Sequence, residues 1–98
     1  MKELTSQQRK YLTKEAHDLN PVVMVGQKGV TEGLLTMVRE SLENHELIKV
    51  KFVDYKESRR EISDEIAQKC DACLIRVVGN IAILYRPQDD PAKRRYKA

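Results

Sequence analysis

The chain has 98 residues, which suits a single domain with one hydrophobic core. Its 18 Lys and Arg residues against 15 Asp and Glu give a net charge of only +3, so overall charge does not require a polyanionic partner. Two cysteines are too few for a disulfide framework, and the polar N-terminus lacks the apolar stretch of a signal peptide or membrane span. We therefore expect a cytoplasmic protein that does not enter membranes.

The first predicted helix begins after Thr5, because Thr5 and Gln8 have the spacing of a capping box. Apolar residues recur at helical spacing and define its inward face: Leu12, Ala16 and Leu19. The other side carries three cations: Arg9, Lys10 and Lys14. Such a face is either simply solvated or part of a binding surface, and the helix alone does not distinguish the two.

Two glycines then enclose a polar, cationic dipeptide in the loop Gly26-Gln27-Lys28-Gly29. The apolar run 22–25 before this loop follows a proline and is typical of a buried strand. Thr31 after the loop can cap a second helix, which ends near Asn44-His45. Its apolar positions recur at helical spacing: Leu34, Leu35, Met37, Val38 and Leu42.

A loop between a strand and a helix is a plausible phosphate site, because the first amides of the helix lack intrahelical partners. Glycine permits close approach at Gly26 and Gly29, so backbone amides around them could hold phosphates while Lys28 adds charge. KH domains grip single-stranded RNA with a G-x-x-G loop in this way. A plain turn is the simpler interpretation of the motif, and its spacing excludes mononucleotide and dinucleotide loops.

The second half of the chain predicts one more helix and three more strands. Leu47 to Val53 alternates, with Ile48, Val50 and Phe52 on one face and Lys49 and Lys51 on the other. Ser58 and Glu61 have capping-box spacing and predict a third helix, whose inward residues are Ile62, Ile66, Ala67 and Cys70. The runs 74–78 and 81–86 flank Gly79-Asn80 and predict a hairpin with a tight turn.

The predicted order is α-β-α-β-α-β-β, an α/β fold with a four-stranded mixed sheet in a single compact domain. Helices two and three should cover one face of the sheet and leave the other partly exposed, with Lys49, Lys51 and Arg76 on it. We place the domain at residues 1–86. Residues 87–98 form a basic tail, which we expect to be mobile.

No constellation of residues predicts catalysis, a metal site or a cofactor. Cys70 and Cys73 have chelating spacing, but His17 and His45 lie far apart and do not complete a zinc site. The pair also follows a predicted helix instead of opening one, so the helix dipole does not favour thiolates. We therefore expect inert, largely buried thiols and no small-molecule substrate.

Three separated segments resemble one known family: residues 20–32, His45 to Lys51, and Val78-Gly79 with Leu84-Tyr85-Arg86. Their order is similar to that of the CRM domain, named for chloroplast RNA splicing and ribosome maturation, and of its stand-alone bacterial YhbY-like members. The resemblance implies a fold like the C-terminal domain of bacterial translation initiation factor three, with no known catalytic activity. One departure is Cys70-Asp71-Ala72, where family members often have a Thr-Gly-Ala-like turn.

The same resemblance implies an RNA-binding protein that associates with ribosomal RNA of large-subunit precursors and assists ribosome assembly. The nine candidate RNA-binding residues are Gly26, Gln27, Lys28, Gly29, Arg9, Lys10, Lys14, Lys49 and Lys51. The alternative is a protein-protein adaptor on ribosomal particles. We expect a monomer in either case.

Overall fold

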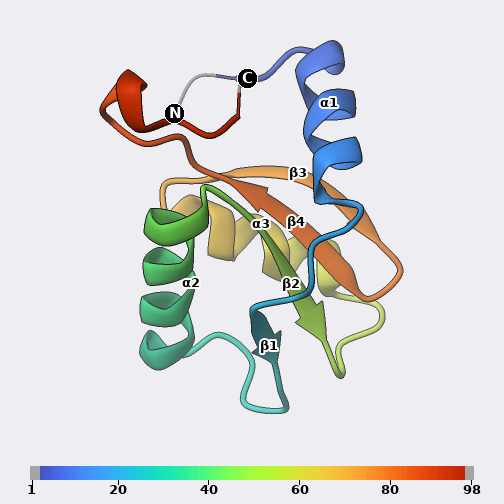
Figure 1. Cartoon of the computed structure of the whole chain (residues 1–98). Coiled ribbons are helices and arrows are strands. Elements are labelled where there is room, and N and C mark those ends of the chain that lie inside the picture. The colour runs from blue at the N-terminus through green and yellow to red at the C-terminus, as the bar shows by residue number, and fades with distance from the viewer. Residues whose placement is uncertain (1–2, 97–98) are drawn as a thin grey trace.

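The computed structural model describes residues 3–96 and contains three α-helices around one four-stranded sheet (Figure 1). The elements in chain order are α1 (Ser6–Ala16), β1 (Val23–Val25), α2 (Glu32–His45), β2 (Leu47–Phe52), α3 (Arg59–Lys69), β3 (Cys73–Val78), β4 (Ile81–Tyr85) and the short 3-10 helix η1 (Pro91–Lys93). The strands lie in the order β1-β2-β4-β3, with β1 parallel to β2 and the other neighbours antiparallel. The predicted element order and mixed sheet are confirmed.

Local capping explains where two of the three helices begin. The Thr5 hydroxyl accepts from the Gln8 amide at 3.1 Å, while the Gln8 side chain accepts from the Thr5 amide at 2.7 Å. Thr31 likewise accepts from the backbone amide of Leu34. The capping box predicted at Ser58 is wrong: α3 begins after Ser58, but the hydroxyl makes no capping bond. Its ψ of 8° departs from the extended backbone that normally directs an N-cap side chain toward the helix amides.

The sheet carries a hydrophobic core on each face. Helices α2 and α3 cover one face, as predicted, and the alternating β2 residues Ile48, Val50 and Phe52 point into that core. Helix α1 lies across the other face, where a smaller core joins it to three strands. The buried members of this second core are Leu12, Ala16, Leu47, Ile75, Ile83 and Tyr85.

Helix α1 covers only part of the second face of the sheet. The expected burial of the β1 segment is therefore only partly correct. The run 22–25 was expected to be buried, yet Met24 is 58% exposed and Val22 is 43% exposed. Strand β1 forms an edge of the sheet, so only Val23 and Val25 reach the core under α2 and α3. Met37, one of the apolar positions at helical spacing in α2, is also 51% exposed.

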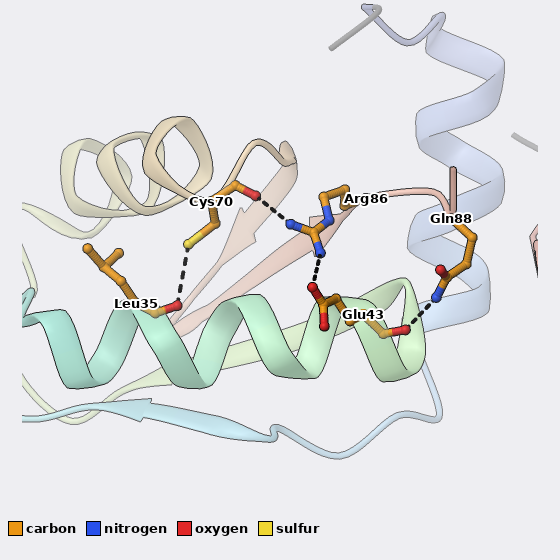
Figure 2. Close-up of polar contacts among 5 residues, drawn as sticks. All are labelled: Leu35, Glu43, Cys70, Arg86 and Gln88. Atoms are coloured by element: carbon orange, nitrogen blue, oxygen red, sulfur yellow. Dashed lines mark hydrogen bonds and ion pairs between the residues drawn. The ribbon is translucent and has the colours of Figure 1, made fainter. Parts of the chain in front are cut away.

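Polar contacts tie the ends of α2, α3 and β4 together (Figure 2). The Arg86 guanidinium donates to the Cys70 carbonyl at 3.1 Å and lies 3.7 Å from a Glu43 carboxylate oxygen. The Cys70 thiol points at the Leu35 carbonyl. Burial raises the pKa of both Cys70 and Cys73, which keeps the thiols neutral and agrees with a packing role.

The chain after β4 folds back onto the domain through a buried carboxylate. Glu46 caps α2 at a φ of 64°, is 1% exposed, and accepts from the backbone amides of Gln88 and Arg95. Tyr96 then packs edge-on against Tyr85, with ring centroids 6.4 Å apart. These contacts place the described part of the tail, residues 87–96, against the domain.

Candidate functional site

The G-x-x-G loop is a tight turn in which the two glycines have different roles. The Gly29 amide donates to the Gly26 carbonyl at 3.0 Å, so this amide is occupied within the turn. Gly29 has a φ of +66°, which disfavours any residue with a Cβ. A Cβ on Gly26 would meet no atom within 4 Å. Gly29 therefore serves the turn itself, whereas the space above Gly26 is open to a ligand.

Tyr55, in the loop after β2, supports the turn from one side. Its hydroxyl donates to the Gln27 carbonyl and lies 3.2 Å from the position that a Cβ on Gly29 would take. Because the C=O and N–H of a trans peptide point in opposite directions, the Lys28 N–H points away from Tyr55. No sequence pattern predicts this role, since Tyr55 belongs to no periodic pattern and its partner lies 28 residues away.

A second feature is the α1 groove, formed by two adjoining hollows between α1 and the sheet. The first is lined by Arg9, Lys10, Thr13, Lys14, Ile75 and Arg76. The second is lined by Thr13, His17, Lys49, Arg76, Val78, Ile81 and Ile83. Among these described residues there are five cations and a histidine but no carboxylate, so the α1 groove has a positive field.

Two of the predicted cations also fix α1 to the sheet. The Arg9 guanidinium donates to the carbonyls of Leu74 and Ile75 at 2.7 and 3.1 Å. These carbonyls lie at the irregularity in β3, where the pairing with β4 skips Ile75. Lys49 donates to the His17 carbonyl at 3.0 Å, at the end of α1. Sequence patterns could not distinguish these structural contacts from a free cationic face.

The other basic residues remain available to a ligand. Across residues 3–96, no hydrogen bond or ion pair engages the side chains of Lys10, Lys14, Lys28, Lys51 and Arg76. The α1 groove brings together Arg9, Lys10, Lys14 and Lys49, while Lys51 lies one alternation further along β2. The loop after β1, which carries Lys28, lies at the opposite end of the sheet from α1 (Figure 1). The sheet surface therefore connects the two groups.

The chain is similar to a known protein family over most of its length. The model of the CRS1 / YhbY (CRM) domain matches residues 4–86. The chain belongs to this family. An RNA-binding protein of Haemophilus influenzae is 40% identical over 91 residues, covering 92% of both chains. A Bacillus subtilis protein named "Probable RNA-binding protein YqeI" is 31% identical over 84 residues, or 85% of this chain and 88% of the relative.

A solved structure agrees with the CRM fold. The solution structure of a hypothetical Staphylococcus aureus protein, described as a candidate RNA-binding protein, has a TM-score of 0.78. It is 26% identical and is aligned over 94% of this chain and 97% of its own. In the described part of the CRM chain, no cluster of three or more His, Cys, Asp or Glu side chains could hold a metal ion. No helix within residues 3–96 is long and apolar enough to span a membrane.

Proposed function

We propose that this CRM-family protein binds ribosomal RNA of large-subunit precursors in the cytoplasm and assists ribosome assembly without catalysing a reaction. The observation that carries the proposal is the α1 groove, whose cations come from α1, β2 and β3 and have no carboxylate among them. Residues far apart in the sequence thus form one positive surface, as a polyanionic ligand requires. The names of the relatives support RNA as that ligand.

The G-x-x-G loop supplies the closest contact to the RNA backbone. The outward amide of Lys28 donates to a phosphate oxygen, and the Lys28 ammonium neutralises its charge. The absence of a side chain at Gly26 lets the sugar-phosphate chain approach the turn. Gly29 and Gln27 act indirectly, because they hold the turn in shape and orient the amide of Lys28.

The α1 groove extends this contact along the RNA. Lys10, Lys14 and Arg76 point from a rigid helix and strand and have no competing partner in the described chain, so they contact phosphates directly. Arg9 and Lys49 add to the positive field while keeping α1 in place. Lys51 continues the positive surface toward the loop. Binding of this kind depends on shape and charge more than on sequence.

Substituting Lys28 tests the loop. Lys28→Ala should weaken binding to every RNA and reduce the magnitude of the salt slope by about 0.7 for each lost single-strand phosphate contact. Lys93→Ala, in the exposed helix η1, removes the same charge away from the proposed surface and should change neither quantity. An unchanged slope for Lys28→Ala would remove the loop from the RNA site.

The ribosomal part of the proposal needs a cellular test. Tagged protein should sediment with large-subunit precursors in a sucrose gradient and should be released when the RNA is digested completely by nuclease. Association that survives complete digestion would support the protein-protein adaptor instead. Sedimentation with mature particles alone would contradict a role in assembly.

A further inference from the structure

The sheet face beside α1 has an uncovered region at the end that carries the G-x-x-G loop. Met24, Lys51, Ile81 and Val78 are consecutive register partners across all four strands. Met24 points to this face because its neighbours Val23 and Val25 point into the core under α2 and α3. We call these four residues, with Val53 beyond Lys51, the open face.

The open face is unusually apolar for an uncovered surface. Met24 is 58% exposed, Val53 is 53% exposed and Val78 is 51% exposed. Single exposed aliphatic residues are common, but neighbours that form a continuous patch mark a surface that contacts something else. Helix α1 ends at Ala16 and buries the other part of this face, and Ile81, half-buried against the smaller core, marks the boundary between the two parts.

Charge identifies the kind of molecule that fits the open face. Lys51 lies between Met24 and Ile81, and the adjacent register row contains Lys49, Ile83 and Arg76. The nearest acidic residue along β2, Asp54, uses its carboxylate to accept from the Tyr55 amide. A surface that alternates aliphatic groups with cations matches a ligand that alternates flat apolar groups with anions.

Unpaired RNA has this composition, because its bases expose their faces and its phosphates are charged. Duplex RNA does not, since its bases are stacked within the helix and only the backbone and groove edges are accessible. The open face also extends from Met24 of β1, the strand that leads into the G-x-x-G loop, to Ile81 and Val78, which line the α1 groove (Figure 1). A strand that contacts both must cross it.

We propose that the open face is a docking surface for the bases of unpaired RNA. The strand runs from the G-x-x-G loop over Met24, Ile81 and Val78 into the α1 groove, with its phosphates on Lys28, Lys51 and Arg76. This inference rests on the proposed RNA-binding function and adds the substrate class: single-stranded segments in preference to duplex.

Uncharged substitutions separate base contacts from phosphate contacts. The double variant Met24→Gln with Val78→Thr preserves side-chain size and net charge, and both positions are more than half exposed. It should bind a single-stranded RNA oligonucleotide on the order of tenfold more weakly in fluorescence anisotropy titrations. Its salt slope should stay at the wild-type value, because no phosphate contact is lost. Met37→Gln is the matched control, since Met37 is 51% exposed on α2, across the sheet.

A second measurement uses the unaltered protein and does not depend on a folded variant. Wild-type protein should bind an abasic oligonucleotide of the same length, and the matching duplex, more weakly than the single strand at equal salt. Equal affinity for all three, or a double variant that binds like Met37→Gln, would overturn the inference. In that case Lys28→Ala would still change the salt slope, so the proposed function would survive. If the double variant instead loses a nuclease-resistant protein partner, the open face binds protein and the inference is wrong.

Discussion

An alanine substitution should destabilise the protein at Gly29 but leave its stability almost unchanged at Gly26. At Gly29 the left-handed backbone costs an alanine roughly 1 to 2 kcal/mol. The new methyl group would also lie 3.2 Å from the Tyr55 hydroxyl. Displacing that hydroxyl from the Gln27 carbonyl costs about 1 kcal/mol more. Gly29→Ala should therefore lower the free energy of unfolding by about 2 to 3 kcal/mol.

Gly26→Ala is the matched comparison. Gly26 has no positive φ, and its added Cβ meets nothing within 4 Å, so stability should change by less than about 0.5 kcal/mol. Urea denaturation followed by circular dichroism measures both values. The methyl group occupies the space proposed for the phosphate, so RNA affinity should fall although the fold is intact. Equal destabilisation by the two substitutions would refute the different roles of the glycines, and unchanged RNA affinity of Gly26→Ala would refute close approach there.

Three other predictions concern the G-x-x-G loop, the tail and the two thiols. Tyr55→Phe removes the donor to the Gln27 carbonyl and should cost about 1 kcal/mol; the Gly29 amide, which donates within the turn, should exchange faster in NMR and RNA affinity should fall, and unchanged exchange would contradict this. Glu46→Gln replaces one buried acceptor oxygen by a donor and should cost about 1 to 3 kcal/mol, with faster hydrogen exchange at Gln88 and Arg95; protection equal to wild type would show that the carboxylate does not hold the tail. Burial raises the pKa of Cys70 and Cys73, so the folded chain binds those protons more tightly and this stabilisation is lost as pH rises through the raised pKa values. Iodoacetamide should therefore react more slowly at pH 8 with folded protein than with urea-unfolded protein, and equal rates would contradict the burial.

The sequence predicted the features of the fold that depend on nearby residues. The Thr5 and Thr31 caps, the alternation of β2 and the hairpin at Gly79 each arise from residues within a few positions of one another. The same logic failed at Ser58, because the loop before α3 places this residue at a ψ of 8° despite the favourable spacing. Spacing indicates that a cap is possible, whereas the backbone decides whether it forms.

Features that depend on residues far apart in the chain could not be predicted from the sequence. A cation on a helix face looks the same whether it is solvated or bonded, so the contact of Arg9 with β3, 65 residues away, left no local trace. The exposure of Met24 follows from the edge position of β1 and the limited reach of α1. The burial of Glu46 depends on amides 42 and 49 residues later. Each of these three features can be seen only in the folded structure.

Mapping RNA crosslinks to individual residues tests the central claim most directly. Protein and RNA are crosslinked by ultraviolet light in cells, and the modified peptides are identified by mass spectrometry. The crosslinks should fall in the G-x-x-G loop around Lys28, on the open face that crosses all four strands, and along the α1 groove. Crosslinks confined to residues 87–96, or to the outer surfaces of α2 and α3, would contradict RNA binding by this face.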